Sequence, residues 1–536
     1  MACFCMLAYA CTPRQHPVKR DATGRILVDT TPNSKPQTPE EALRSIYLQK
    51  GYHLELVASE PMVQEPVAIA WDGNARMYVA EMNTYMQDID GTGEDAPVCK
   101  IKRLEDTDGD GKMDKVTVYI DSLVLPRMIL PLDNRVLVNE TYSNNIYSYE
   151  DTNGDGKADV KKLVYANNIR DGKNLEHQKS GLMWNLDNRI YVTVDAVRYQ
   201  FINDKLVPDT LIESAWGQWG IGNDDYGRIY LNLAGGETPA LNFHQNPHYG
   251  QFNMEGQYDD AFQAVWPILS TPDVQGGPVR LRADSTLNHF TACTSPVIYR
   301  GDKLPADLKG DLLICEPVGR LIRRAKVINT EGKITLINAY DKQEFIASTD
   351  MNFRPLFTAN GPDGCVYIVD MYRGIIQEGN WTKEDSYLRP AIIKKGLDKN
   401  NSRGRIYRLV HDGYKRSKVH PRLLDETSAA LVNYLSHPNG WWRDNAQKLL
   451  VLRKDKSVVP ALTDLVKNSP NPLARIHALW TLNGMEALNN DLLFYALADK
   501  DSKARRNAVW AAEDFANDPT VLNRLENLMQ LFPAKK

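Results

Sequence analysis

The sequence of 536 residues lacks a long apolar stretch and lacks an excess of charge of one sign. No apolar run reaches the length of about 18 residues that a helix needs to cross a bilayer, so we expect no membrane-spanning segment in the body of the chain. The 64 Lys and Arg stand against 68 Asp and Glu, giving a net charge of −4, and no basic run stands out. Nucleic acid is therefore not an expected partner.

Cysteine is scarce, and its spacing argues against two kinds of metal site. Three of the seven Cys lie in the first eleven residues, and the others, Cys99, Cys293, Cys315 and Cys365, are too far apart for a zinc pattern. No C-x-x-C-H motif occurs, so c-type haem is not expected. The four body cysteines are either buried free thiols or members of one or two disulfides, and both alternatives stay open.

The leader, residues 1–40, predicts export. Its start, "MACFCMLAYAC", is apolar and rich in small residues, and the polar text that follows begins directly after Cys11. This pattern is typical of the end of a lipoprotein signal, with Cys11 as the lipid-bearing residue. It predicts a periplasmic or cell-surface protein held to the outer membrane by a lipid anchor. An ordinary secretory signal and a wrongly assigned start are the alternatives.

A hairpin pattern recurs through residues 41–412. Each copy has an apolar strand, a turn rich in Asp, Asn and Gly, and a second strand of the type apolar-Tyr-apolar, because Asp-Gly and similar pairs supply the positive φ that tight turns need. The copies lie at 67–81, 128–140, 180–194, 220–233, 295–317 and 356–370. Six hairpins predict a six-bladed β-propeller, with a seven-bladed ring as the alternative. Ring closure is expected to pair residues 52–59 with 404–410.

After about residue 412 the sequence pattern becomes typical of α-helices. In residues 413–536 three segments share a capping Asn or Asp, an Arg four residues later and an Ala three residues after that: 439–452, 471–484 and 501–514. The period of about 30 residues is typical of HEAT-like helical pairs, which dock or bind partners. The predicted fold is thus mainly β, a six-bladed propeller followed by a short HEAT-like α-helical solenoid.

Three long stretches resemble a known family. They are "DIDGTGEDAPVCKIKRLEDTDGDGKMDK" (88–115), "YRGDKLPADLKGDLLICEP" (299–317) and "ASTDMNFRPLFTANGPDGCVYIVDMYRGII" (347–376). They are similar to the membrane-bound dehydrogenase domains of large planctomycete, verrucomicrobial and Bacteroidetes proteins, over about residues 40–412. Those domains are commonly followed by HEAT repeats and a c-type cytochrome domain. Because the haem motif is lacking here, the resemblance implies a separate cytochrome or other protein as partner, reached through the helical repeats.

A more distant resemblance concerns the segment "LEHQKSGLMWNLDNRIYVTV", residues 175–194. It is similar to a segment of soluble glucose and sorbosone dehydrogenases, which hold pyrroloquinoline quinone at the mouth of a six-bladed propeller. The resemblance makes His177 the general base that takes a proton from a sugar hydroxyl, a role suited to imidazole. It also makes Arg354 a cofactor-binding residue, with Arg320 and Arg127 as weaker candidates. The Arg-Asn-x-Gln-Gly segment of those enzymes is absent, which argues against the quinone.

Side chains that follow the core strands are expected to line the same mouth. A ring of carboxylates, aromatics and Arg suits a carbohydrate, whose hydroxyls need hydrogen-bonding groups and whose C–H faces need rings. The candidates are Glu81, Tyr85, Glu140, Tyr142, Asp195, Arg198, Glu316, Asp370, Tyr372 and Arg373. The alternative for each is a strand-end charge in solvent.

Two acidic loops repeat 45 residues apart, and each matches the start of a calcium-binding loop. Position twelve, where an EF-hand has a bidentate Glu, is Thr117 in one and Lys162 in the other, so neither is an EF-hand. We expect turns between outer strands of consecutive blades that clamp Ca²⁺, with an ion-free Asx turn as the alternative. The predicted ligands are Asp106, Asp108, Asp110, Asp114, Asp151, Asn153, Asp155 and Asp159.

Three functions remain open from the sequence. The first is oxidation of a carbohydrate-type alcohol with a quinone cofactor and His177 as base. The second is a non-catalytic scaffold that recognises a glycan or a protein. The third is a carbohydrate lyase or hydrolase that uses the same ring of acids, since a fold alone does not determine chemistry.

Overall fold

The computed structural model of the chain describes residues 20, 22, 26–170, 172, 174–211, 217, 219–233, 238–244, 250–252, 254–330, 333–417 and 419–531. The predicted lipidation site, Cys11, lies outside them. Within this part of the chain, no helix has the length and apolar character needed to cross a membrane.

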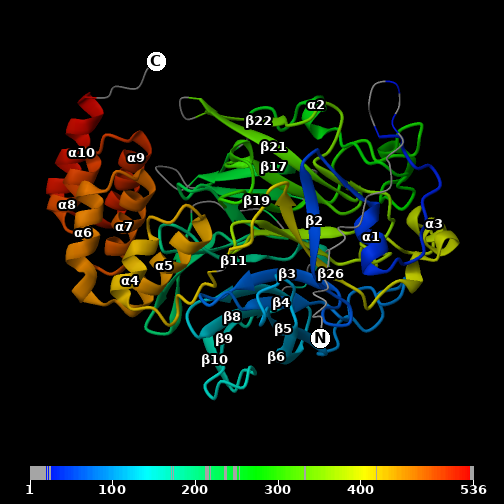
Figure 1. Ribbon diagram of the computed structural model, residues 1–536, viewed down its shortest axis with the longest axis horizontal. Coiled ribbons are helices and arrows are strands. Elements are labelled where there is room, and N and C mark those ends of the chain that lie inside the picture. Colours follow the sequence, from blue (N-terminus) through cyan, green and yellow to red (C-terminus); the bar gives the residue numbers. More distant parts are fainter. Residues whose placement is uncertain are drawn as a thin grey trace, which may run out of the picture.

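Five antiparallel sheets of four strands make up most of the β part (Figure 1). The first two contain β3 (Pro66–Trp71), β4 (Met77–Glu81), β5 (Cys99–Glu105) and β6 (Lys115–Leu123), then β7 (Pro126–Pro131), β8 (Arg135–Glu140), β9 (Ile146–Glu150) and β10 (Val160–Tyr165). The next two contain β11 (Gly181–Trp184), β12 (Ile190–Val192), β13 (Val197–Ile202) and β14 (Lys205–Thr210), then β15 (Gly222–Asn223), β16 (Ile229–Leu233), β17 (Thr238–His244) and β18 (Gly250–Phe252). The fifth contains β2 (Tyr52–Ser59), β24 (Pro355–Asn360), β25 (Val366–Asp370) and β26 (Arg405–His411).

One further sheet departs from this pattern by having six strands. It is formed by β1 (Ile46–Leu48), β19 (Thr294–Ile298), β20 (Leu312–Glu316), β21 (Leu321–Thr330), β22 (Lys333–Asn338) and β23 (Ile346–Ser348). The long β21 pairs with β23 at its start and with β22 over its remainder. All six predicted hairpins form, but the prediction of six like blades is not matched, because five regular blades stand beside this larger sheet.

The ring closes as the sequence predicted. β2 pairs antiparallel with β26, from Tyr52 opposite His411 to Ser59 opposite Arg405. The outermost strand of the last sheet therefore comes from the start of the propeller, which leaves no loose edge at the junction.

The first strands of the sheets lie around a common centre. β3 contacts β7 and β24, β7 contacts β11, and β19 contacts β15 and β24. Each first strand runs toward the turn of its hairpin, so the strand starts lie at one face of the propeller and the hairpin turns at the other. The mainly β part is thus a propeller with a central channel.

The C-terminal helical region contains α4 (Ser428–Tyr434), α5 (Gly440–Arg453), α6 (Val459–Asn468), α7 (Pro472–Gly484), α8 (Asn490–Leu497), α9 (Ser502–Ala511) and α10 (Pro519–Leu531). The side chains of Asn439, Asn471 and Asp501 cap α5, α7 and α9, as predicted. The repeated Ala residues of these three helices are fully buried, which allows close helix packing. A helical region therefore follows the propeller, while its assignment to HEAT repeats stays a prediction.

This helical region covers the face of the hairpin turns. Asn439 donates to the carbonyl of Gly361, and Gln447 donates to the carbonyl of Leu186. Arg300, at the start of another turn, forms a bidentate ion pair with Asp444 of α5 at 2.7 and 2.8 Å. Figure 1 shows α4–α10 gathered on one side of the β part, with α1 (Pro39–Ser45) and α3 (Leu388–Lys395) on the opposite side. Helix α5 therefore closes one end of the central channel.

The remaining short elements lie in connections. They are α2 (Asp260–Gln263), η1 (Leu175–His177), η2 (Gly277–Arg280), η3 (Ala306–Leu308), η4 (Leu397–Lys399), η5 (Lys456–Val458) and η6 (Ala512–Phe515). The four described cysteines, Cys99, Cys293, Cys315 and Cys365, are buried free thiols.

Candidate functional site

A cavity of about 280 Å³ opens at the end of the channel opposite α5. Its walls come from the starts of β3, β19 and β24 and from the loops beside them. The lining residues are Val67, Met82, Tyr85, Glu176, His177, Trp219, Gln275, Arg280, Thr291, Ala292, Thr294, Pro317, Val318, Leu356, Met371, Ile376, Gln377 and Trp381. We call this space the mouth cavity. Two residues predicted from the sequence, His177 and Tyr85, meet in it.

Glu176 and His177 reach the mouth cavity from the short helix η1. The side chain of Asn174 caps this turn by accepting from the Glu176 amide at 2.7 Å. Asn174 also donates to Glu378 at 2.5 Å, which ties the turn to the segment beyond β25. The acid and the imidazole are thus adjacent groups on a braced loop, and the structure adds Glu176 to the predicted His177.

The carboxylate of Glu176 is held from three directions. It accepts from the Glu378 amide at 2.8 Å, from the indole of Trp381 at 3.1 Å and from the hydroxyl of Tyr85 at 3.4 Å. Burial raises the pKa of Glu176 to about 7, because the hydrogen bonds to its charged form do not offset the loss of water. A carboxyl group with this pKa exchanges a proton near neutral pH.

Arg127 supports the same loop through hydrogen bonds. Its Nη2 donates to the carbonyl of Leu175 at 2.8 Å, and its Nε donates to Thr141 at 3.0 Å. Its guanidinium also lies 4.6 Å from the ring of Trp219. The predicted cofactor-binding Arg127 therefore positions two parts of the mouth cavity.

The other two predicted arginines, Arg320 and Arg354, form ion pairs inside the protein. Arg320 pairs with both oxygens of Asp273, at 2.9 and 2.6 Å, and Arg354 donates to the same carboxylate at 2.7 Å. The two guanidinium groups hold the pKa of Asp273 well below its usual range. Arg354 also donates to the carbonyls of Pro317 and Gly374. All three side chains are fully buried, and neither Arg lines the mouth cavity.

Several predicted substrate-binding residues are also buried behind the cavity walls. Glu81 pairs with Lys102 at 2.9 Å, and Tyr372 donates to Asp350 at 2.7 Å. Arg373 donates to the carbonyl of Tyr85 at 2.6 Å. Of these contacts, the one from Arg373 supports a residue of the cavity wall, Tyr85.

Two more predicted carboxyl groups, Asp370 and Glu316, have raised pKa values. Burial raises the pKa of each to about 7. Asp370 accepts from the amides of Arg354 and Tyr372, at 2.8 and 2.9 Å. Glu316 accepts from the amides of Thr291 and Ala292, both at 2.9 Å, and so shapes the wall that these residues form.

The remaining predicted residues do not line the mouth cavity. Glu140 accepts from the Val124 amide at 2.7 Å, and Asp195 pairs with Lys179. Arg198 pairs with Asp209 at 2.7 Å and, at 3.6 Å, with Glu513 of the helical region. Tyr142 lies under Arg170, with 4.9 Å between the guanidinium and the ring.

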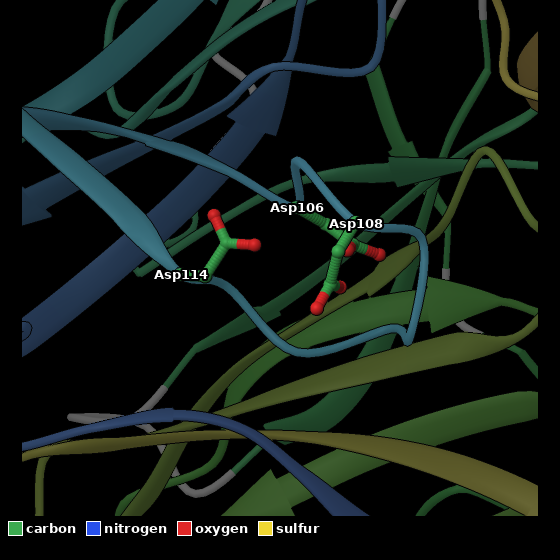
Figure 2. Close-up of side chains that lie close together, drawn as sticks. All are labelled: Asp106, Asp108 and Asp114. Carbon is green, nitrogen blue, oxygen red and sulfur yellow. The ribbon is translucent and has the colours of Figure 1, made fainter.

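The first acidic loop joins β5 to β6, as predicted, and brings Asp106, Asp108 and Asp114 together. One oxygen from each lies within 4.8 Å of the others, a spacing that a metal ion can bridge. Figure 2 shows Asp106 and Asp108 on one arm of the loop and Asp114 on the other. The same carboxylates also serve the loop itself: Asp106 accepts from the amides of Gly109 and Gly111 at 2.8 and 2.9 Å.

The second acidic loop joins β9 to β10 and repeats these hydrogen bonds. Asp151 accepts from the amides of Gly154 and Gly156, both at 2.8 Å, and Asp159 accepts from Thr152. Here Arg103 of β5 donates to Asp151 at 3.2 Å, which supplies a positive charge. The first loop also has an arginine against it, because the guanidinium of Arg416 packs on Gly111. The two loops are thus the same turn, and Ca²⁺ binding to either stays a prediction.

Residues that sequence reasoning missed provide much of the polar and aromatic wall: Trp219, Gln275, Arg280, Thr291, Gln377 and Trp381. They lie in loops without strand periodicity, so no pattern singled them out. Glu176 could have been predicted as a cavity residue, because it directly precedes His177 in the sequence.

Fold and site together define a β-propeller with a ligand-sized cavity at one end of its channel and a helical region at the other. The chain belongs to the family described as "Domain of unknown function (DUF7133)", whose model matches residues 38–413. No curated protein matches the chain.

Solved propeller structures are similar to the chain at low identity. A luciferin-regenerating enzyme is 12% identical with a TM-score of 0.40, and the match covers 69% of this chain and 99% of that one. The soluble aldose sugar dehydrogenase from Escherichia coli, in its apo-form, is 12% identical with a TM-score of 0.39, over 67% and 99%. The holo form of the pyranose dehydrogenase PQQ domain from Coprinopsis cinerea is 11% identical with a TM-score of 0.34, over 70% and 98%.

The walls of the mouth cavity do not fit a polyanionic quinone. Such a cofactor needs several fixed cations for its carboxylates. Among the described residues that line the cavity, Arg280 is the only Lys or Arg, and Glu176 adds a carboxylate of the same sign as the ligand. Arg320 and Arg354 are paired with Asp273 behind the wall.

Proposed function

We propose that the chain binds a small carbohydrate-type alcohol in the mouth cavity and acts on one of its hydroxyls through His177 and Glu176. The observation that carries the proposal is the meeting of His177 and the carboxyl group of Glu176 with Tyr85, Trp219 and Trp381 in one ligand-sized space. Aromatic rings pack against the C–H faces of sugars, and amide side chains such as Gln377 bond their hydroxyls.

The proposed chemistry assigns a role to each group. His177 takes the proton of the bound hydroxyl, because imidazole is a suitable base near neutral pH. Glu176, with its pKa of about 7, gives or takes a proton beside it. The oxidation predicted from the sequence also requires that the carbinol carbon lose a hydride to a two-electron acceptor. A polyanionic quinone does not fit these walls, so the acceptor is taken to be a separate redox molecule, for which a dye substitutes in the assay.

The proposal is tested by turnover of a panel of mono- and disaccharides, with products followed by NMR. Dye reduction with and without added pyrroloquinoline quinone runs in parallel, so that a quinone-dependent oxidation is detected if it occurs. His177→Gln is expected to keep carbohydrate binding and lose turnover at least tenfold. His53→Gln, on β2 and outside the mouth cavity, is the matched control and should change neither.

Two results would overturn parts of this account. Equal turnover by the wild type and His177→Gln removes the base from the proposal. Carbohydrate binding without turnover of any ligand leaves the non-catalytic glycan-binding alternative in its place.

Further predictions from the sequence join this proposal. We count the six-stranded sheet as the sixth blade, and α4–α10 as HEAT-like pairs that offer a surface to another protein. We also retain Ca²⁺ in the acidic loops and an exported, lipid-anchored chain as proposals. The contacts of α5 with α7 and of α7 with α9 support the repeat assignment.

A further inference from the structure

A second cavity, of about 220 Å³, lies in the channel between the mouth cavity and α5. It shares Val67 and Trp219 with the mouth cavity, so the two are neighbours along the channel. We call it the inner cavity. Its walls are mostly apolar side chains of β3, β7 and β11, with Phe357 of β24. Helix α5 contributes Asp444, Asn445 and Lys448 to the end that it closes.

Lys448 is an unusual wall residue, because its side chain is 6% exposed in a largely apolar space. Its ammonium donates to the carbonyl of Pro131 at 2.6 Å, which uses one of its three hydrogens. Among the described residues, no carboxylate lies within 4.0 Å of its Nζ. Burial lowers the pKa of Lys448 to about 8, against the opposing influence of Asp133, Asp72 and Asp444. A buried positive charge is therefore only partly compensated.

The nearby Asp444 does not supply the missing partner. Both of its oxygens receive hydrogen bonds from Arg300, at 2.7 and 2.8 Å. Arg127 is a further cation in the inner-cavity wall. The local charge in this cavity thus favours an anion.

Two other polar atoms in the wall have no hydrogen-bond partner among the described residues. The Oδ1 of Asn445 accepts no hydrogen bond, and the indole nitrogen of Trp184 donates none, although both atoms are buried. Asn445 is itself only 6% exposed. Buried polar atoms in folded proteins are nearly always paired, so unpaired ones in a cavity wall indicate a missing ligand or water.

We propose that the inner cavity binds a small organic carboxylate. The ammonium of Lys448 and the indole N–H of Trp184 donate to the carboxylate, and Asn445 accepts from a hydroxyl of the ligand. The apolar body of the ligand packs against residues such as Ile129 and Met183. A bare inorganic anion leaves these apolar walls unfilled, which is why the ligand is organic. This inference does not rest on the proposed function of the mouth cavity.

Benzoate and benzyl alcohol make a matched pair of probes, because they share a ring and differ in charge. In isothermal titration with the full chain at pH 7, benzoate is expected to bind with one site and at least tenfold more tightly than benzyl alcohol. Its affinity should fall about tenfold between pH 7 and pH 9, because the protonated form of Lys448 is lost through a pKa of about 8. The charged groups around this amine are Arg127, Asp72, Asp133 and Asp444.

Variants separate this site from the mouth cavity. Lys448→Met keeps the apolar stem and removes the charge, so it should fold and lose benzoate affinity at least tenfold. Trp184→Phe should lower the affinity for benzoate by a smaller factor. Lys500→Met, at an exposed position of the helical region, and His177→Gln should both bind benzoate as the wild type does.

Three outcomes would overturn the proposal. They are equal binding of benzoate and benzyl alcohol, undiminished benzoate binding by a folded Lys448→Met variant, and no heat of binding for either probe. The last would mean that the cavity holds only water.

Discussion

The indole nitrogen of Trp381 donates a hydrogen bond to the Oε2 of Glu176 across 3.1 Å. This contact joins two loops that lie 205 residues apart and places an aromatic ring beside the proton-exchanging carboxyl group. Because both residues line the mouth cavity, the contact links ligand packing to the chemistry proposed for Glu176.

Replacing Trp381 tests this link. Trp381→Phe keeps an aromatic ring but removes the N–H, so it should weaken carbohydrate binding by about 1–2 kcal/mol, roughly five- to thirtyfold. It should also raise the pKa of Glu176 further, since the lost hydrogen bond favours the charged form. Titration calorimetry and a pH–activity profile measure the two effects. Unchanged affinity and an unchanged profile would contradict the assigned role.

The raised pKa of Glu176 predicts how stability depends on pH. The folded pKa is about 7 and the ordinary value is 4.5, so ionisation is harder in the folded state. The cost is absent below about pH 4.5, grows as the pH rises to about 7 and is then fully present. Glu176→Gln should therefore be more stable than the wild type at pH 8 by about 1–3 kcal/mol, and equal to it near pH 4.5.

Denaturant unfolding at both pH values measures that difference. The pKa values of Glu316 and Asp370 are also near 7, but both residues are present in the wild type and in the variant. Their contributions to the free energy of unfolding therefore cancel in the difference between the two proteins. A variant that is less stable than the wild type at pH 8 would show that the carboxylate is favoured in the fold.

The buried Asp273 predicts a large loss of stability on neutralisation. Asp273→Asn removes the charge shared by Arg320 and Arg354 and leaves two buried guanidinium groups, at a cost of about 3–5 kcal/mol. The exposed Asp385→Asn is the control for loss of one negative charge. Urea unfolding compares the two. If Asp273→Asn costs no more than the control, these arginines are not held by the carboxylate, and a ligand-binding role for them reopens.

The first acidic loop predicts stabilisation by Ca²⁺. Ligand binding to the folded state raises stability, so adding a chelator should lower the midpoint of thermal unfolding of the wild type by several degrees. Asp108→Ala should reduce this shift, because it removes one of the three carboxylates that lie close enough together to share an ion. A midpoint that is the same with Ca²⁺ and with chelator would mean that the loop is an Asx turn without an ion.

Local signals made much of the propeller predictable. Asp, Asn and Gly residues marked the turn of every hairpin in the sequence, and the need to close the ring predicted the pairing of β2 with β26. The caps of α5, α7 and α9 were visible for the same reason, since a cap lies within three residues of the amides that it serves. No comparable local pattern predicts irregular pairing of the outer strands, such as the pairing of β21 with both β22 and β23.

Long-range pairing explains why much of the predicted site was not found at the cavity wall. Arg320 and Arg354 lie 47 and 81 residues from Asp273 in the sequence. No local pattern predicts that the buried Asp273 forms ion pairs with both of them. Trp381 and Gln377 come from a loop without periodicity. The position of His177 at the cavity could be predicted because its local sequence resembles a known site, while its role stays a prediction. Glu176 is recognised only through its contacts with Glu378 and Trp381.

The most direct test of the central claim is calorimetric titration of the wild type and Trp381→Phe with a panel of small carbohydrates. The account predicts that at least one carbohydrate binds the wild type with one site, and that Trp381→Phe binds it several-fold more weakly. Absence of binding by every carbohydrate of the panel, or equal binding by the two proteins, would contradict the claim that the mouth cavity is a carbohydrate site.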